Sequence, residues 1–272
     1  MATDRPIAFI LVSSDHGTMI VNRNDYRMVD SNRAYGVGYD ILQTGCFSPD
    51  EIELGRNMLK LLRSYRGEGL MVVDCGANIG THTVEWAKTM TGWGKVIAFE
   101  AQEYVFYSLA GNIAINNCFN ATAHHVAVGK ECGEIAIPVA DYLKPANFGG
   151  LELKQVTEEF IGQPINYSKS ALKPMRLWSI DSLSLPRLDF LKMDVEGMEE
   201  EVLFGAQETI KNYKPIMLIE VFKSNQNSIR NTLKSWGYTH YYPVGMNILT
   251  LHENDPCLKH INVNSPPPTV PV

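Results

Sequence analysis

An acid and two glycines directly follow a short apolar stretch, at a spacing that suits ligand binding by the backbone. Residues 71–73 have the composition of a strand buried on both faces, and Asp74 ends that stretch. Gly76 and Gly80 come next, and Thr81–Met90 has the pattern of a helix. A strand, a glycine loop and a helix in this order form half of a nucleotide-binding βαβ unit, because glycine lets a ligand approach the backbone closely.

The spacing within this loop distinguishes between ligands. A dinucleotide-binding loop has the pattern Gly-x-Gly-x-x-Gly, but here Asn78 follows Ala77 where the central glycine is required. A phosphate-binding loop ends in Gly-Lys-Ser/Thr, whereas Gly80 is followed by Thr81 and His82. The remaining pattern, Asp-x-Gly-x-x-x-Gly, is typical of loops that bind S-adenosyl-L-methionine (SAM), whose ammonium and sulfonium groups suit an acid at the strand end. The alternative is a plain turn from strand to helix that binds nothing.

A second acid ends the next apolar stretch. Residues 95–99 predict a buried strand, and Glu100 comes directly after them. Glu100 follows Asp74 at close to the offset of roughly 20 residues at which such folds place a carboxylate on the ribose hydroxyls of a nucleotide. We therefore expect Glu100 to bind ribose, and the alternative is an exposed acid at a strand end.

Further acids, and one histidine, could act as a general base or bind a metal ion. Either would activate a weak nucleophile such as a hydroxyl. Asp194 and Glu196 follow a buried strand, Glu220 lies near the end of another, and His82 lies in the first turn after the glycine loop. The carboxylates could also bind a divalent cation through oxygen. Glu196 could instead cap a helix N-terminus, and His82 could simply cap or pack.

The elements that would position these residues alternate between strand and helix from residue 70 to residue 222. This order predicts an α/β fold with a doubly wound, mainly parallel sheet, helices on both faces and one late antiparallel strand. The expected strands are residues 7–12, 18–21, 71–73, 95–100, 121–128, 134–139, 188–195, 215–222, 238–244 and 248–252. The expected helices are residues 49–65, 81–90, 104–117, 196–210 and 227–236.

The chain divides into three parts by composition. Residues 1–45 predict a β-rich extension, 46–262 a SAM-binding domain, and 263–272 a proline-rich tail that cannot bury a core. Tyrosines beside glycines between residues 26 and 39 suit either a mobile flap over a pocket or a packed edge loop. The irregular stretch Asp141–Pro174 predicts an insertion at the mouth of the site.

Composition and charge exclude several classes of protein. The chain has 272 residues, is 45% hydrophobic and carries a net charge of -6, which is ordinary for a globular protein and argues against duplex nucleic acid as the main partner. Five scattered cysteines without a Cys-x-x-Cys pair indicate reduced thiols and a cytoplasmic location. The apolar run Ile7–Val12 is too short for a signal peptide or a membrane span.

Several sequence blocks together resemble one enzyme family. They are Val-Val-Asp-Cys-Gly-Ala-Asn-Ile-Gly at 72–80, Ala-Phe-Glu at 98–100, Val-Ala-Val-Gly at 126–129, Ile-Asp-Ser-Leu at 180–183, and Leu-Lys-Met-Asp-Val-Glu-Gly at 191–197. Together they resemble the FkbM family of SAM-dependent methyltransferases over roughly residues 40–222. The resemblance implies a class I methyltransferase (Rossmann-like) fold with seven strands, the last antiparallel, and O-methylation of a sugar, glycan or natural-product hydroxyl.

The resemblance also implies roles for individual residues. Asp74 and the loop residues Gly76, Ala77, Asn78 and Gly80 would line the methionine part of SAM. Glu100 would bind the ribose, and Asp194 would lie near the transferred methyl group. The family often has proline close after the ribose-binding acid, whereas this chain has Ala101 and Gln102. Two other functions stay open: an NAD-dependent oxidoreductase, against which the missing central glycine argues, and a non-catalytic binding module that keeps the fold.

Overall fold

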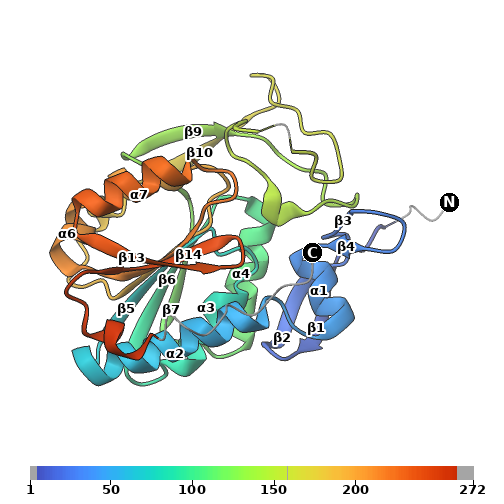
Figure 1. The fold of residues 1–272 in the computed structure, drawn as a ribbon. Coiled ribbons are helices and arrows are strands. Elements are labelled where there is room, and N and C mark those ends of the chain that lie inside the picture. The colour runs from blue at the N-terminus through green and yellow to red at the C-terminus, as the bar shows by residue number, and fades with distance from the viewer. Residues whose placement is uncertain (1–4, 158, 262–272) are drawn as a thin grey trace.

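The computed structural model describes residues 5–157 and 159–261, so the proline-rich tail predicted at 263–272 lies outside the described residues. Its main sheet has seven strands in the order β13-β14-β12-β11-β5-β6-β7 (Figure 1). Only β14, the last strand in sequence, runs against its neighbours in this sheet. The predicted mainly parallel seven-stranded sheet with one antiparallel strand is therefore confirmed. Its strands are β5 (Leu70–Cys75), β6 (Gly94–Glu100), β7 (Ala121–His125), β11 (Phe190–Met193), β12 (Ile216–Glu220), β13 (Tyr238–Val244) and β14 (Asn247–His252).

Helices cover both faces of this sheet, because successive strand residues point to opposite sides. Val72 packs in one apolar cluster with helices α2 and α3, while its neighbour Val73 packs in another cluster with α5, α6 and α7. Leu109 of α4 packs on Ala98, which lies on the same face as Val72. The helices are α2 (Pro49–Arg66), α3 (Thr81–Thr89), α4 (Glu103–Ile115), α5 (Glu199–Gly205), α6 (Gln207–Tyr213) and α7 (Gln226–Ser235) (Figure 1).

Two local predictions were wrong. The helix predicted over residues 196–210 is broken into α5 and α6, because the Asp181 carboxylate accepts hydrogen bonds from the backbone N–H groups of Glu208 and Thr209 and so starts a new helix. The pattern Ser48-Pro49-Asp50-Glu51 predicts a helix start that the hydroxyl of Ser48 caps. Its backbone instead adopts a left-handed conformation, and its side chain makes no capping hydrogen bond.

Smaller elements surround the main sheet. The strands predicted at 7–12 and 18–21 are confirmed and pair as an antiparallel hairpin, and the next residues form a second short hairpin and a helix, α1, that was not predicted. The strand predicted at 121–128 is divided between β7 and β8, and β8 belongs to a separate three-stranded sheet of order β8-β10-β9. These elements are β1 (Phe9–Ser14), β2 (Gly17–Asn22), β3 (Arg27–Met28), β4 (Ala34–Tyr35), α1 (Val37–Thr44), β8 (Ala127–Val128), β9 (Gly133–Ile137), β10 (Lys173–Trp178) and the 3₁₀ turns η1 (Phe148–Gly150), η2 (Asp181–Leu183) and η3 (Pro256–His260).

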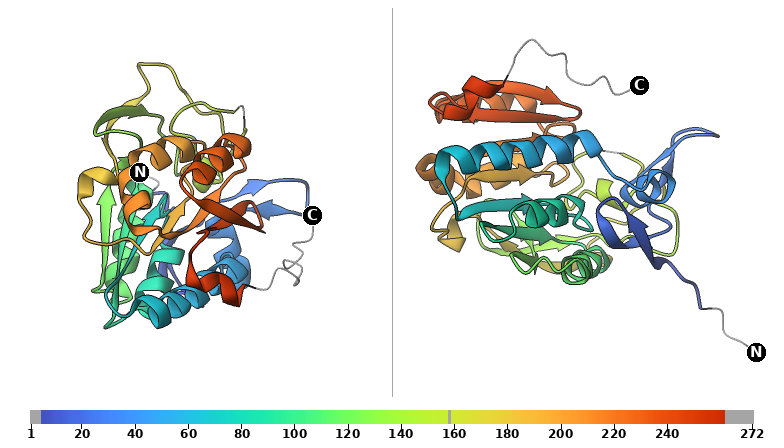
Figure 2. Two further views of the ribbon diagram at one scale, coloured as in Figure 1. Left: turned by 60° about the vertical axis from the view of Figure 1, so that its left-hand side comes forward. Right: turned by 90° about the horizontal axis from the view of Figure 1, so that it is seen from below.

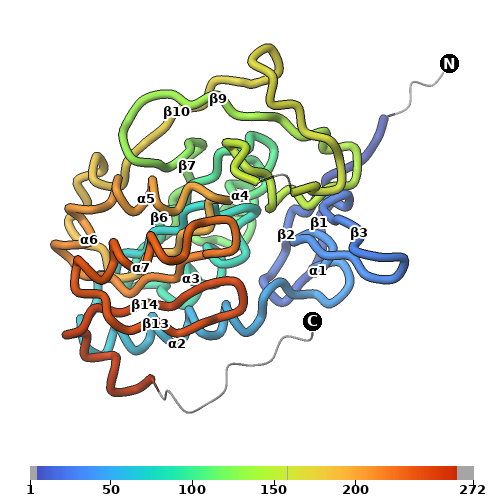
Figure 3. The backbone as a smooth tube through the Cα atoms, turned by 45° about the horizontal axis from the view of Figure 1, so that its top comes forward, coloured from blue at the N-terminus to red at the C-terminus, as the bar shows by residue number. Residues whose placement is uncertain are grey.

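The N-terminal elements and the insertion between β9 and β10 lie side by side (Figures 2 and 3). The buried carboxylate of Asp25 joins them, because its two oxygens accept hydrogen bonds from the N–H groups of Gly38 and Phe148, each at 2.9 Å. The backbone N–H of Ala146 also donates to the carbonyl of Asn24. The division of the chain at residue 45 stays a prediction. Among the described helices, none combines the length and the apolar character that crossing a membrane would require.

Candidate cofactor and active site

A cavity of about 640 Å³ opens at the carboxyl ends of the parallel strands β5, β6, β11 and β12. This is the edge at which open α/β sheets bind their ligands. The N-terminal extension contributes Tyr35 and Asp40 to the walls, and the insertion contributes Asn147 and Gly149. The cavity is therefore enclosed by three parts of the chain that are distant in sequence.

The glycine loop between β5 and α3 forms part of this cavity. The backbone N–H groups of Gly76 and Ala77 donate to the carbonyl of Phe99, which ties the loop to the end of β6. Gly76 has a φ of +75°, and a Cβ placed there would lie 1.8 Å from the carbonyl oxygen of Asp194. Only glycine fits this position, because the loop crosses directly over the end of β11.

Glu100 lies where the sequence predicts a ribose-binding acid. Its carboxylate is buried, lines the cavity, and accepts hydrogen bonds from the N–H groups of Asn78 at 3.0 Å and Gln102 at 2.8 Å. Burial raises the pKa of Glu100 to about 7, against the lowering effect of these backbone hydrogen bonds. The alternative of an exposed acid at a strand end is wrong.

Asp74 and Gly80 do not line the cavity, in contrast to the other four residues expected to bind the cofactor. Asp74 is fully buried beneath the loop, where one carboxylate oxygen accepts a 2.6 Å hydrogen bond from the hydroxyl of Thr83 in the first turn of α3. Gly80 lies against Leu109 of α4, which a Cβ would approach to 2.6 Å. These two residues hold the strand, loop and helix together, so the expectation that they contact a ligand is corrected.

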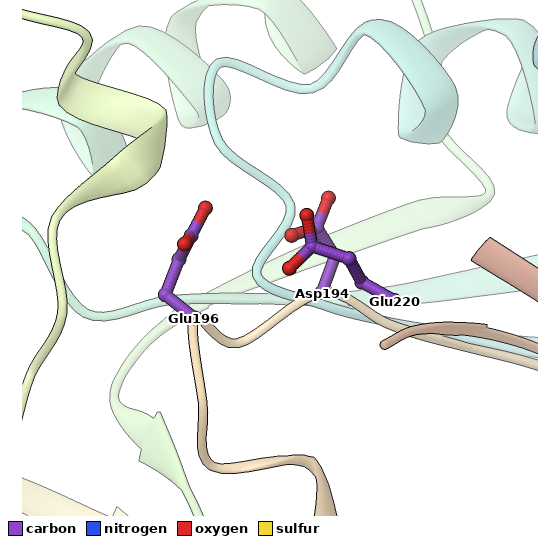
Figure 4. A group of neighbouring side chains, drawn as sticks. All are labelled: Asp194, Glu196 and Glu220. Carbon is purple, nitrogen blue, oxygen red and sulfur yellow. The ribbon is translucent and has the colours of Figure 1, made fainter. Parts of the chain in front are cut away.

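Three carboxylates gather beside the loop, at the ends of β11 and β12 (Figure 4). Asp194 and Glu196 follow β11, Glu220 ends β12, and one oxygen of each lies within 4.8 Å of the others. All three line the cavity. Burial, reinforced by the nearby charge of Asp194, raises the pKa values of both Glu196 and Glu220. The sequence-based grouping of these three acids is therefore confirmed as a geometric cluster.

Two lysines partly neutralise the acid cluster. Lys192 Nζ lies 2.9 Å from Asp194 Oδ2, and Lys223 Nζ lies 2.6 Å from Glu196 Oε2. Lys223 also contacts Glu159 of the insertion at 2.9 Å and donates to the carbonyl of Gly150. Both ammonium groups are nearly fully buried, so their pairing with carboxylates is strongly favoured.

His82 also lines the cavity, at the start of α3. Its Nε2 lies 3.1 Å from Glu51 Oε1, and its ring packs against Trp86 with 5.3 Å between centroids. The other oxygen of Glu51 accepts a hydrogen bond from Asn247, so the carboxylate is held in place. A carboxylate fixed against a histidine orients that ring, which is an arrangement found around general bases.

Sequence reasoning missed Lys192, Lys223, Glu51 and Gln102 as residues of the site. Lys192 carried a usable signal, since it is a lysine inside an otherwise apolar and fully buried strand. Gln102 lines the cavity, donates to the carbonyl of Phe148 and accepts a hydrogen bond from the hydroxyl of Tyr142. These contacts join segments distant in sequence, so nothing local in the sequence indicates them.

The sequence is similar to those of known proteins. A family model described as the methyltransferase FkbM domain matches residues 74–239. A curated relative, Methyltransferase 1 of Beauveria bassiana (strain ARSEF 2860), is 26% identical over 148 residues, which cover 50% of this chain and 58% of the relative. The chain thus matches little more than half of that relative's length.

Solved structures of low sequence identity are also similar. A crystal structure of methyltransferase FkbM from Methylobacillus flagellatus KT has a TM-score of 0.47 and 19% identity, and the match covers 68% of this chain and 44% of that one. The N-terminal domain of human METTL16 in complex with SAH has a TM-score of 0.45 and 12% identity, with coverage of 77% and 72%.

The strand order and the single antiparallel strand define a class I methyltransferase fold. Since the family model matches more than half of its residues, this chain belongs to the FkbM methyltransferase family. The resemblance carried by the sequence blocks is thereby confirmed.

Proposed function

We propose that this protein is a SAM-dependent O-methyltransferase that acts on a hydroxyl of a sugar, a glycan or a natural product. The observation that carries the proposal is the shared cavity, in which the glycine loop and the Glu100 carboxylate lie together with the acid cluster of Asp194, Glu196 and Glu220. Family membership supports methyl transfer as the reaction.

The residues of the cavity fit the cofactor. Each oxygen of Glu100 accepts one backbone N–H and keeps further acceptor capacity, so the carboxylate can also accept hydrogen bonds from both ribose hydroxyls. Gly76, Ala77 and Asn78 would lie along the methionine part, with Asp74 and Gly80 supporting them from below. When bound, SAM supplies a methyl group on a positively charged sulfur, which makes that methyl group electrophilic.

The chain must position the acceptor and take the proton from its hydroxyl. Glu196 and Glu220 suit this role because burial gives them a higher proton affinity than an exposed carboxylate has. Asp194 lies beside them, and His82 with Glu51 is a second candidate base in the same cavity. A divalent cation held by the carboxylates would be an alternative means of activating the hydroxyl.

The charge of the cavity favours a neutral acceptor. Six acids and two lysines line it, and both lysines are already paired with carboxylates, so the described lining offers no unpaired lysine or arginine for a phosphorylated or otherwise anionic acceptor. A sugar, a glycan or a polyketide-type alcohol meets this condition, whereas a nucleic acid does not. The acids are Asp40, Glu100, Glu159, Asp194, Glu196 and Glu220, and the lysines are Lys192 and Lys223.

Transfer of a labelled methyl group tests the proposal. The full chain is incubated with methyl-labelled SAM and with panels of neutral sugars, glycans, natural-product alcohols and sugar phosphates. We expect label on a neutral hydroxyl, with kcat about 10²-fold lower for Asp194→Asn and unchanged for Asp50→Asn, an exposed acid of α2. Preference for the sugar phosphates, or wild-type turnover by Asp194→Asn, would contradict the proposed acceptor or site.

The same experiment separates the rival functions. A protein that binds SAM but transfers no methyl group across the whole panel would be a non-catalytic SAM-binding module. A protein that binds NAD instead of SAM in a parallel titration would be an oxidoreductase. We further propose a cytoplasmic location, which is supported by the free state of all five cysteines, each of them among the described residues.

A further inference from the structure

The acid cluster is built from two adjacent strand ends rather than from one flexible segment. Asp194 follows β11 and Glu220 ends β12, and these strands pair in parallel register through Met193 and Ile219. Glu196 stands on a backbone with a φ of +54°, in the left-handed region that a residue other than glycine rarely adopts. The backbone at these strand ends therefore fixes the positions from which the three acidic side chains extend (Figure 4).

The two buried lysines do not pair with all three carboxylates of this cluster. Lys192 pairs with Asp194, and Lys223 is shared between Glu196 and Glu159. No ion pair to Glu220 occurs among the described residues, although its side chain is only 8% exposed. Its Oε2 is buried without a hydrogen-bond partner, and Figure 4 shows its carboxylate beside that of Asp194. Buried carboxylate oxygens in proteins normally have a hydrogen-bond donor or a cation as a partner, so this oxygen indicates a site for one.

We propose that Asp194, Glu196 and Glu220 bind a divalent metal cation through one oxygen each. Carboxylate oxygens are the preferred protein ligands of Mg²⁺, Mn²⁺ and Ca²⁺. The oxygens lie within 4.8 Å of one another, and oxygens on opposite sides of Ca²⁺ are roughly 5 Å apart, against roughly 4 Å for Mg²⁺. These distances between carboxylate oxygens suit Ca²⁺ directly. Small side-chain rotations would shorten them enough for Mg²⁺ or Mn²⁺.

The cation would leave coordination positions for water and for an acceptor oxygen, because three carboxylates supply only three of the six or more ligands that these ions take. Coordination would lower the pKa of an acceptor hydroxyl and hold it at the strand ends. This catalytic role rests on the proposed methyl transfer, whereas cation binding itself does not. The competing arrangement is a proton shared between Glu220 and Asp194, with no metal.

Direct binding of Mn²⁺ to the full chain tests the site without SAM and without an acceptor. The protein is freed of metal with a chelator and titrated with MnCl₂ while free Mn²⁺ is followed by electron paramagnetic resonance. MgCl₂ and CaCl₂ are then added as competitors. We expect one Mn²⁺ per chain in the wild type, displaced by the other two ions, and a rise in unfolding temperature on binding.

Two variants locate the site. Glu220→Gln keeps the shape of the side chain and removes a ligand charge, so we expect Mn²⁺ affinity to fall at least about tenfold. The variant should fold, because it removes a buried charge that has no partner, and its metal-free unfolding temperature checks this. Glu53→Gln is the matched control, since Glu53 is an exposed residue of α2 far along the chain from the cluster.

The outcomes separate this inference from the proposed function. Absence of Mn²⁺ binding to the wild type, or equal binding by wild type and Glu220→Gln, would overturn the metal site, and the latter would show an adventitious ion only. Neither result tests cofactor binding, which is measured in a separate titration with S-adenosylhomocysteine, the demethylated product of SAM. Conversely, the protein could bind Mn²⁺ through Glu220 and fail to bind S-adenosylhomocysteine. That result would support the metal site and contradict the methyltransferase proposal.

Discussion

Replacing Gly76 with alanine should damage both the fold and the cofactor site, because this residue lies at the junction of β5 and β11. The new Cβ would lie 1.8 Å from the carbonyl oxygen of Asp194, and the backbone φ of +75° disfavours any side chain. The atoms can separate only if the strand ends move apart. That movement would break the hydrogen bond that Asp194 N–H donates to the carbonyl of Cys75 at 3.1 Å.

The expected loss of stability follows from these two effects. A side chain in the left-handed region costs about 1–2 kcal/mol, and the lost backbone hydrogen bond costs about 1 kcal/mol. Together they predict a decrease of about 2–3 kcal/mol in the free energy of unfolding, or about 5–10 °C in the unfolding temperature. Affinity for the demethylated cofactor should fall at least about tenfold, because the loop backbone would no longer lie against the cavity.

Urea denaturation and calorimetric titration with S-adenosylhomocysteine measure these two quantities. The matched control is Gly133→Ala, since Gly133 lies in β9 with no atom within 4 Å of the added Cβ and without a positive φ. We expect this control to change stability by no more than a few tenths of a kcal/mol. Equal stability and equal affinity in the two variants would refute the argument that the loop depends on glycine at Gly76.

Three further predictions address the charges of the site. The pKa of Glu100 is raised to about 7 by burial, so the folded protein binds more protons than the unfolded chain between about pH 4.5 and 7, and stability falls as the pH rises through that window. Glu100→Gln should reduce the fall in the free energy of unfolding across that pH window by up to about 3 kcal/mol. An unchanged pH dependence of stability in urea denaturation would contradict the raised pKa of Glu100. His82→Gln should lower kcat with little change in affinity for S-adenosylhomocysteine, and Glu51→Gln should lower it less, because Glu51 only positions the ring; full kcat in His82→Gln would exclude that base. Lys223→Met should destabilise the protein by about 3 kcal/mol by leaving Glu196 without its buried cation, whereas Glu159 keeps its ion pair with Arg27, and Lys223→Arg should recover most of this loss in the same denaturation assay.

The sequence alone predicts those features that depend on local patterns. Apolar runs ending in acids give β5, β6, β11 and β12, and parallel strands place their ends on one edge. For this reason the strand pattern is enough to group Glu100, Asp194 and Glu220 at one edge of the sheet. The central strand, the glycine loop and the late antiparallel strand follow from the same reasoning.

Features that depend on tertiary contacts could not be predicted. Asp74 has the sequence position of a ligand-binding acid, yet its carboxylate accepts a hydrogen bond from Thr83 in the first turn of the following helix. Lys223 reaches across to the insertion, and Asp25 joins that insertion to the N-terminal extension. The last two contacts join parts of the chain that only tertiary packing brings together, which no local pattern records.

A structure of the full chain in complex with S-adenosylhomocysteine tests the central claim most directly. We expect both ribose hydroxyls to lie within hydrogen-bond distance of the Glu100 carboxylate and the sulfur to face Asp194. A nucleoside bound elsewhere, or one whose ribose has no contact with Glu100, would contradict this expectation.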